Sequence, residues 1–464
     1  MKSLSELKDE LWSYAETGFE EFKSAKAMCE FLKEADFEVK DDICGMKTAF
    51  EAKWGKGKPV IVFLAEYDAL DGLNQVSDLD KCQKEEGSQT AGHGCGHHLL
   101  GCGAINAAIK YRQYLIDNNK EGTVILLGCP GEEAGSGKAY LARDKYFDNC
   151  DIALTWHPGL LNTVVTGSSQ SCIAVYFKFK GIAAHAAASP ELGRSALDAI
   201  EITNIGINYL REHIKSSDKV HYAYIDAGGK APNVVQSSSI EKLFVRSKNN
   251  KECRNLYDRV VKCAIGAATM TETELEVIFD EGLSNLVSNL TLENLAYESL
   301  EKIYKYNYTK EELEYAQKFK NTYDISLLVD ELTEGVMDKK KLLDDITNNP
   351  ICSHVVKTIH NDVCICGSTD VGDVSWCIPT LQINTACFAY GAEGHSWQWV
   401  AQGKSSIAQK GYELAGEVLC DVAIKLHENP SLIEQAKKEL KDKLGNEKYD
   451  CLIPKDVKPH IFDF

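Results

Sequence analysis

The sequence has no apolar run long enough to cross a membrane. Its longest runs, such as Val60–Ala65 and Val124–Leu127, fall far short of the roughly 18 residues that a membrane span requires. Met1–Phe22 is acidic and amphipathic, and it lacks the apolar core and the small-residue cleavage site of a secretory signal. We therefore expect a cytoplasmic protein that makes no membrane contact.

Positive charge is also scarce. The chain has 51 Lys and Arg residues against 69 Asp and Glu residues, which gives a formal net charge of -18. Proteins that bind nucleic acid or anionic membranes unaided use Lys and Arg to replace counterions. The charge balance therefore argues against both partners and favours a small-molecule substrate.

The 464 residues are enough for two globular domains, one of which could be inserted in the other. The chain contains no internal repeat and no low-complexity tract. Seventeen cysteines are scattered through a chain that shows no export signal. That distribution is typical of reduced thiols rather than of a disulfide framework.

The flanking parts of the chain predict an α/β sheet. Leu4–Ala35 has helical spacing, and Asn285–Asp362, Ser405–His427 and Leu432–Leu444 also have helical character. Four short apolar runs have the character of strands buried beneath helices. These strand-like runs are Pro59–Leu64, Thr123–Leu127, Ile152–Thr155 and Leu381–Phe388.

A second domain is predicted over residues 171–282, which leaves residues 1–170 and 283–464 for the catalytic domain. Its strands and helices alternate in the order βαββαβ, a split unit of the ferredoxin-like kind that closes its own sheet. The six segments are Cys172–Lys180, Ser195–Ile214, His221–Asp226, Ile240–Ser247, Glu252–Met270 and Thr273–Phe279.

Chemically active residues follow each of the four buried strands of the catalytic domain. Open α/β sheets bind ligands beyond the carboxyl ends of their strands, so such side chains are expected to converge. They are Glu66 and Asp68 after the first strand, Glu132 and Glu133 after the second, His157 after the third and His395 after the last.

The segment from Gly92 to His98 reads Gly-His-Gly-Cys-Gly-His-His and concentrates one thiol and three imidazoles. Residues two apart in an extended segment point the same way, so Cys95 and His97 can reach one metal cluster together. A structural role, or a redox thiol at Cys95, is the alternative that this segment leaves open.

A loop rich in glycine, Gly128–Gly137, carries the adjacent carboxylates of Glu132 and Glu133. Because neighbouring side chains diverge, one can bind a metal while the other moves protons beside it. Taken alone, the loop could equally be an exposed acidic turn.

His157 and His395 each stand in a turn after a strand, where a lone histidine usually has a structural role. Together with Cys95, His97 and Glu133 they make five donors of mixed nitrogen, oxygen and sulfur type. Such a set suits zinc or another borderline divalent metal, and with a bridging water it could hold two ions.

The order and spacing of these motifs resemble those of the aminoacylase and carboxypeptidase family of dinuclear metallohydrolases. Within that family the sequence is most similar to the branch of p-aminobenzoyl-glutamate hydrolases and related dipeptidases. The resemblance spans almost the whole chain, and both order and spacing agree. It is carried by Ala65–Leu70, Gly92–Gly101, Pro130–Lys138, His157–Gly159, Gly181–Ala199, Ala231–Val235, Gly367–Trp376 and Gly394–Gln398.

The resemblance implies a zinc-peptidase-like mixed-sheet catalytic domain with an inserted lid or dimerisation domain. It implies two divalent ions, zinc first and manganese or cobalt as alternatives. The implied metal ligands are Cys95, His97, Glu133, His157 and His395, with Glu132 as general acid and base. Asp68 would orient a ligand from behind, although a turn or capping role is the alternative.

The inserted domain carries three further residues to which the resemblance gives roles. His185 is expected to polarise the scissile carbonyl in the site of a partner copy, which implies a homodimer or an assembly with a related chain. Asn233 and Arg246 are expected to bind the substrate carboxylate. Spacing alone would make His185 a helix-flanking residue, and Arg246 could instead pair with a surface acid.

Three details depart from the family pattern. His98 stands where relatives commonly have Asn or Asp, Asp71 where Pro is frequent, and Val76–Gln89 lengthens the loop before the metal motif. They leave the proposed ligands intact but bear on metal preference and on the substrate mouth. His98 could be an extra ligand or could cap the following helix.

We therefore expect a metal-dependent amidohydrolase that cleaves an N-acyl amino acid or a dipeptide. A dipeptidase that recognises a free amine through an acidic anchor is the first alternative. A catalytically silent dimeric binding protein is the second, and the presence of Glu132 beside Glu133 argues against it. A thiol redox protein using Cys95, with Cys102 as its resolving thiol, is the third.

Overall fold

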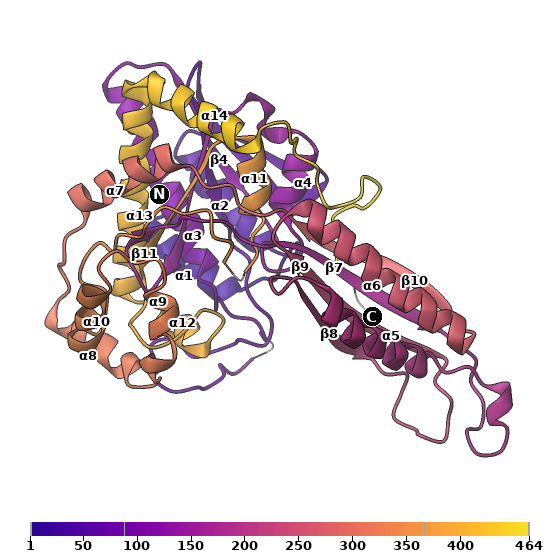
Figure 1. Ribbon diagram of the computed structural model, residues 1–464. Helices are drawn as coiled ribbons and strands as arrows, with labels where there is room; N and C mark the ends of the chain where they lie inside the picture. Colours follow the sequence, from indigo (N-terminus) through magenta and orange to yellow (C-terminus); the bar gives the residue numbers. More distant parts are fainter. Residues whose placement is uncertain (1, 88, 366, 463–464) are drawn as a thin grey trace. The chain divides into compact units, whose positions relative to one another are not determined.

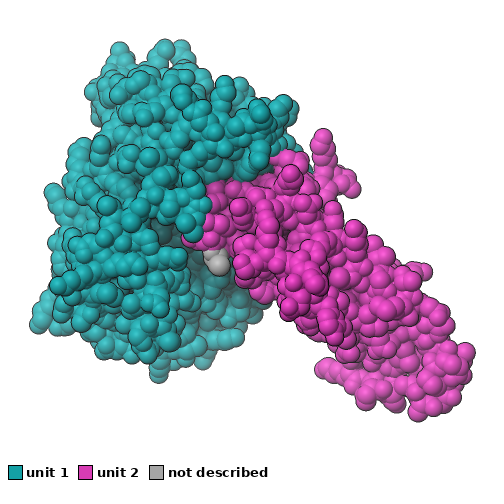
Figure 2. Space-filling view, viewed as in Figure 1, with its two compact units in different colours: residues 1–167, 287–363, 374–449 teal, residues 168–286, 364–373, 450–464 magenta. Residues whose placement is uncertain are grey.

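The computed structural model describes residues 2–87, 89–365 and 367–462, and it divides into two compact units. Figure 2 distinguishes them by colour. Unit 1 comprises residues 1–167, 287–363 and 374–449, and unit 2 comprises residues 168–286, 364–373 and 450–464. The predicted domain boundaries remain a prediction, and unit 2 takes in two segments from outside the 171–282 range.

Unit 1 is built on a seven-stranded mixed sheet (Figure 1) with the order β1-β2-β4-β3-β5-β11-β6. The strands β3, β4, β5 and β11 pair in parallel, whereas β1, β2 and β6 are antiparallel to their neighbours. The strand bounds are β1 Glu38–Ile43, β2 Met46–Lys56, β3 Val60–Ala65, β4 Gly122–Gly128, β5 Ile152–Gly159, β6 Thr163–Val164 and β11 Thr380–Ala386.

Helices cover this sheet. Among them, α3 packs against β3, β4, β5 and α13, and α2 packs against β2. The helices outside the inserted segment are α1 Leu4–Tyr14, α2 Phe22–Glu34, α3 His97–Asp117, α4 Gly137–Arg143, α7 Leu290–Ile303, α8 Lys310–Lys320, α9 Val329–Leu332, α10 Lys339–Asn348, α11 Val371–Cys377, α12 Trp397–Gln402, α13 Ser406–Glu428 and α14 Pro430–Leu444.

The four predicted buried strands are present as β3, β4, β5 and β11. Every residue of β4 is buried, and β3 is buried from Ile61 onward, because the sheet is covered on both faces. Two details of the prediction were wrong. His157 lies within β5, not after it, and the predicted Leu4–Ala35 helix is broken between α1 and α2.

Unit 2 contains a four-stranded antiparallel sheet with the order β10-β7-β9-β8. The helices α5 and α6 pack together and against this sheet, and their shared core includes Phe177, Ile200 and Val260. The chain order is β7 Ser171–Lys180, α5 Ala196–Leu210, β8 Lys219–Asp226, β9 Ser238–Ser247, α6 Asn250–Thr271 and β10 Glu274–Leu283. This order confirms the predicted βαββαβ unit, and with the mixed sheet it confirms the predicted fold class.

Glu241 is a buried carboxyl group in the core of unit 2. Its Oε2 accepts a hydrogen bond of 3.0 Å from Asn204 Nδ2, while Oε1 has no hydrogen-bond partner. Burial raises the pKa of Glu241 to about 7. The native state therefore holds the proton more tightly than the unfolded chain does.

We expect the Glu241→Gln variant to abolish a pH dependence of stability. In the wild type, the contribution of protonated Glu241 is complete below pH 4.5 and is lost as pH rises through about 7. Between pH 5 and pH 8 the wild type should lose on the order of 2–3 kcal/mol relative to the variant. Urea unfolding at both pH values measures this difference. Glu201→Gln, at an exposed position of α5, is the control, and equal pH slopes in wild type and Glu241→Gln would contradict the expectation.

Candidate metal centre

The parallel strands of unit 1 bring the predicted residues to one end of the sheet. Glu66 and Asp68 follow β3, the loop that carries Glu132 and Glu133 follows β4, and His157 lies near the end of β5. In the sheet, Ala65 pairs with Gly128, so the segments after β3 and β4 leave it side by side. The convergence that the strand ends predicted is therefore present.

The Gly92–His98 segment folds as a tight turn into α3. Gly96 has a positive φ of 79° and is the residue before the helix, which begins at His97. A side chain at Gly96 would be strained and would meet Pro158, so glycine is required there. The backbone N–H of His395 donates to the carbonyl oxygen of Gly94 at 2.8 Å, which brings the last predicted ligand to the same turn.

The five predicted ligands form two groups of three donors, and the donor atoms within each group lie within 4.8 Å of one another. Cys95, His97 and His157 make the first group, and Cys95, Glu133 and His395 make the second. The Cys95 thiol is common to both. The chain thus offers candidate ligand sets for two metal ions that share one sulfur.

Two donor pairs have the spacing of metal ligands. Cys95 Sγ lies 3.3 Å from His157 Nε2, and His395 Nε2 lies 3.3 Å from Glu133 Oε1. Bonds of 2.0–2.3 Å in a tetrahedral zinc site place neighbouring donors roughly 3.3–3.8 Å apart. These two separations therefore fit the metal ions that the family resemblance implies.

The rings of His97, which is fully buried, and of His157, which is partly buried, direct their Nε2 atoms toward this cluster. His97 Nδ1 donates to Asp68 Oδ1 at 2.7 Å, and His157 Nδ1 donates to the Pro158 carbonyl oxygen at 2.7 Å. In a neutral imidazole, each donation leaves Nε2 as the acceptor nitrogen, which is the form that binds a metal. The fully buried Nε2 of His97 has no hydrogen-bond partner, as expected of an atom that binds a cation.

Asp68 connects the two ligand groups. One of its oxygens accepts from His97, and the other accepts from the backbone N–H of Glu133 at 2.9 Å. Burial alone would raise the pKa of Asp68, but His97 and these hydrogen bonds lower it below its usual value. The carboxylate therefore fixes the orientation of the His97 ring and the position of the Glu133 backbone.

Burial is graded across the cluster. His97 is fully buried, the Glu132 and Glu133 side chains are 15% and 10% exposed, and that of His395 is 57% exposed. Burial raises the pKa of the Cys95 thiol well above its usual range. A bound cation would favour the thiolate, because thiols bind metals in that form.

The candidate general base lies beside the first group. Glu132 Oε2 is 3.9 Å from His97 Nε2, which is within ion-pair distance of the first donor group. Glu66 and Lys138 lie next to it. Lys138 Nζ is 2.6 Å from Glu66 Oε1, Glu66 Oε2 is 3.3 Å from His97 Nε2, and both side chains are buried. Glu66 was predicted at this strand end without a role, and Lys138 was not predicted, since nothing in the sequence links the two residues.

The three remaining predicted residues lie in unit 2. His185 is exposed, and its Nδ1 accepts hydrogen bonds from the backbone N–H groups of Ala187 and Ala188 at 3.2 and 3.1 Å. Its Nε2 is therefore the protonated nitrogen and can donate outward. The carbonyl oxygen of Asn233 accepts from the backbone of the residue after His185 at 3.0 Å, so these two segments adjoin.

Arg246 lies in β9, where its Nη1 donates to Ser368 Oγ at 2.9 Å. The guanidinium also lies over the Phe244 ring at 5.3 Å. A hydroxyl group and an aromatic ring thus contact this side chain.

The departures from the family pattern lie around the cluster rather than in it. His98 Nε2 donates to the Gly403 carbonyl oxygen at 3.0 Å, and His98 belongs to neither donor group. Asp71 accepts from Thr90 Oγ1 at 2.8 Å. In the long 76–89 loop, of which residue 88 lies outside the described residues, Asp78 accepts from Tyr315 at 2.9 Å.

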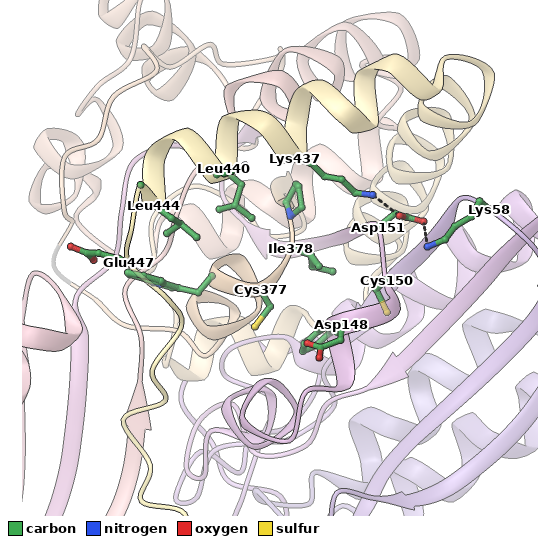
Figure 3. A pocket seen from close by; sticks show the side chains of 15 residues that line it. Lys58, Asp148, Cys150, Asp151, Cys377, Ile378, Lys437, Leu440, Leu444 and Glu447 are labelled. Atoms are coloured by element: carbon green, nitrogen blue, oxygen red, sulfur yellow. Dashed lines mark hydrogen bonds and ion pairs between the residues drawn. The ribbon is translucent and has the colours of Figure 1, made fainter.

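Two cavities of unit 1 differ in their relation to the cluster. One of about 770 Å³ reaches Glu133 and is also lined by Tyr14, Glu16, Lys23 and Asp71. The other, of about 660 Å³, lies beside α14 and contains none of the five ligands; there Lys58 and Lys437 both bind Asp151, at 3.0 and 2.6 Å (Figure 3). Asp151 precedes β5, so this second cavity belongs to the amino end of that strand.

Comparison with known proteins places the chain among amide hydrolases. It is 39% identical to a subunit of p-aminobenzoyl-glutamate hydrolase of Escherichia coli strain K12, over 98% of this chain and 95% of that protein. It is 27% identical to the Xaa-Arg dipeptidase of Mus musculus, over 96% and 90%. No protein-family model matches the sequence.

Solved structures share the fold. An aminobenzoyl-glutamate utilization protein from Klebsiella pneumoniae superposes with a TM-score of 0.60 at 15% identity, over 91% of this chain and 95% of that one. A dinuclear metal-binding peptidase of the M20 family from Bacillus subtilis gives 0.56 at 17% identity, over 92% and 98%.

Fold and sequence thus define a metal-dependent amidohydrolase of the metallopeptidase class, as the sequence predicted. Within that class the particular relationship is clear. The chain belongs to the family of the p-aminobenzoyl-glutamate hydrolase subunits. No helix within the described residues is both long and apolar enough to span a bilayer.

We expect the Asp68→Asn variant to bind divalent cations about 10- to 100-fold more weakly than the wild type, as removal of such a supporting partner typically does. An amide at position 68 cannot accept from both His97 and the Glu133 backbone. Competition with a chromogenic chelator measures the affinity. Asp71→Asn is the matched control at an exposed position three residues away, and an Asp68→Asn affinity equal to that of the control would refute the expectation.

Proposed function

We propose that this chain hydrolyses the amide bond of a small N-acyl amino acid of the p-aminobenzoyl-glutamate type, using two divalent cations. The observation that carries the proposal is the meeting of two donor groups at Cys95, with the carboxylate of Glu132 beside them. The relative at 39% identity, which is named as a p-aminobenzoyl-glutamate hydrolase, supports the substrate class.

Cys95, His97, Glu133, His157 and His395 would hold the cations. Zinc is the proposed ion because the donors are thiol, imidazole and carboxylate, and manganese or cobalt are the alternatives. When bound, such ions polarise a carbonyl group and lower the pKa of water. The remaining chemistry falls to the protein's own side chains.

Glu132 is the proposed general base and acid. Its carboxylate takes a proton from the attacking water and delivers that proton to the departing amine nitrogen, so one group serves both steps. Glu133 cannot do the same, because its Oε1 faces His395. The two adjacent carboxylates therefore divide ligation and proton transfer between them.

Residues of unit 2 are proposed to hold the substrate. Arg246 and Asn233 bind its carboxylate, for which a guanidinium fork is well suited. His185 donates from Nε2 to the carbonyl oxygen that gains negative charge, and the two backbone hydrogen bonds to Nδ1 support this tautomer.

A homodimer is proposed, in which His185 of each copy serves the site of the other. An apolar surface on β8 and α5 supports an interface there. Edge strands with exposed apolar side chains are natural pairing surfaces, and β8 is an edge of its sheet. The exposed side chains are Ile205, Tyr209, Tyr222, Tyr224 and Ile225. A related second chain is the alternative partner, because the E. coli relative is named as one of two different subunits.

One observation favours a dipeptidase with a cationic substrate as a second candidate. The cavity that reaches Glu133 is lined by the carboxylates of Glu16, Glu20 and Asp71 and by one lysine, Lys23. Such a lining attracts a positive group, and a relative at 27% identity is named Xaa-Arg dipeptidase. Glu16 is largely occupied in accepting from the backbone at the start of α2, which weakens this candidate.

A cytoplasmic location is also proposed. All sixteen cysteines that the structure describes are free, as expected in a reducing compartment. The redox alternative for Cys95 receives no support from Cys102, whose thiol faces the Leu4 carbonyl oxygen from within α3.

Glu132→Gln should lower kcat by roughly 10²- to 10⁴-fold, because general acid–base catalysis contributes about that much. Metal content should stay at the wild-type level, since Glu132 is not a proposed ligand. The assay compares the rates at which zinc-loaded protein hydrolyses p-aminobenzoyl-glutamate and Xaa-Arg dipeptides. Inductively coupled plasma mass spectrometry measures the metal content. Substantial turnover by the variant would rule out this role, and a preference for Xaa-Arg would favour the second candidate.

Mixing two inactive variants tests the exchange of His185 between the two copies. In a Glu132→Gln and His185→Ala heterodimer, one site receives both wild-type residues only if His185 acts on the partner's site. After dissociation and reassociation at equal amounts, about a quarter of wild-type activity should return. If His185 acts within its own chain, the mixture stays inactive.

A further inference from the structure

The segment that joins α1 to α2, residues 15–21, packs against the loop that carries Glu132 and Glu133. It interrupts what sequence periodicity predicts as one helix, and Ala15 and Phe19 in it have positive φ values of 40° and 61°. Such conformations are uncommon for residues other than glycine and persist only where the surroundings hold them. The contacts of this segment show what holds it.

Glu21, at the end of the segment, is fully buried and binds the loop that carries Glu132 and Glu133. Its Oε1 accepts a hydrogen bond of 2.8 Å from the backbone N–H of Gly131, the residue before Glu132. Its Oε2 accepts a hydrogen bond of 2.8 Å from Thr48 Oγ1. The carboxyl group thus links the loop to β2.

The loop is shaped to fit this segment. A side chain at Gly135 would come within 2.3 Å of the Phe19 ring, and one at Gly18 within 3.0 Å of the Gly131 Cα. Gly131 itself has a φ of 65°, and its carbonyl oxygen accepts from the Ser136 N–H at 2.8 Å, which closes the loop. Close backbone approach at three glycines leaves the loop little freedom to shift.

The same segment also contacts the chain section that follows β3. The backbone N–H of Ala69 donates to the Glu16 carbonyl oxygen at 2.8 Å, and Thr17 forms a parallel bridge with Ala69. Ala69 follows Asp68, which in turn accepts from the Glu133 backbone. The segment therefore touches both chain sections that position the two adjacent carboxylates.

We propose that Glu21 is a positioning residue for the general base Glu132, acting through its hydrogen bond to Gly131. The inference rests on the proposed function, because it concerns the residue to which that function assigns proton transfer. Without the carboxyl group, the Gly131 N–H is buried with no acceptor, at a typical cost of about 1–3 kcal/mol. The loop can avoid that cost by moving, and a displacement of about 1 Å can lower turnover roughly 10²-fold.

Three variants separate positioning from general stability. Glu21→Ala removes the acceptor, Glu21→Gln keeps an oxygen for Gly131, and Thr48→Val removes only the second hydrogen bond of Glu21. Burial, then the charge of Asp68, raise the pKa of Glu21 to about 8, so a neutral amide is a close replacement near neutral pH. All three are measured as metal-loaded enzyme.

In Glu21→Ala we expect kcat to fall about 10- to 100-fold, with KM and metal content near the wild-type values. Glu21→Gln and Thr48→Val should keep kcat within about threefold, even though Thr48→Val unfolds at lower urea concentration. Wild-type kcat in metal-loaded Glu21→Ala would overturn the proposal. So would an equal loss of kcat in Thr48→Val.

Hydrogen–deuterium exchange of residues 129–136 provides a test that does not need turnover. Exchange should be at least about tenfold faster in Glu21→Ala and unchanged in Thr48→Val, because only the first opens the loop locally. Unchanged exchange in Glu21→Ala overturns the proposal even if the wild type hydrolyses no amide. In that case the failure of the proposed function appears separately, in the wild-type assay.

Discussion

The parallel pairing of β3, β4, β5 and β11 is the constraint on which the candidate centre depends. Parallel strands end on the same side of a sheet, so one register places four distant chain sections together. Ala65 pairs with Gly128, and Asn384 pairs with His157. A slip of one residue in either pairing would turn every side chain of that strand to the opposite face of the sheet. The burial of the strands therefore fixes their register, and the register fixes the positions of the ligands.

Charge is the second constraint. Glu66, Asp68 and Glu133 are largely buried within the same cluster, and Lys138 is the buried ammonium that pairs with Glu66. Carboxylates held in a protein interior need compensating charge or protons. Cations bound between these groups would provide that charge, which links metal binding to the stability of unit 1. The single carboxylate of Asp68 orients two ligands, His97 on one side and Glu133 on the other.

Sequence periodicity revealed most of this architecture where burial is complete. The four central strands are continuous apolar runs, and the βαββαβ order of unit 2 follows from alternating and helical segments. The strands β1 and β2 were missed because four of the six residues of the edge strand Glu38–Ile43 are charged, and because Met46–Lys56, the next strand in the sheet, mixes charged and small residues. The break between α1 and α2 was missed because both halves are amphipathic, and the interruption arises from contacts with a loop more than a hundred residues away.

The candidate site was predictable in part for the same reason. Strand ends and glycine-rich turns marked the five ligands and Glu132, whereas His185, Asn233 and Arg246 came from family resemblance, because an exposed histidine in a turn has no distinguishing local pattern. Buried partners such as Lys138 and Glu21 act through tertiary contacts that periodicity does not encode. Anomalous X-ray diffraction from crystals grown with zinc tests the central claim most directly. Two peaks, each within bonding distance of Cys95 Sγ, would agree with the account, whereas a single peak, or peaks away from that sulfur, would contradict it.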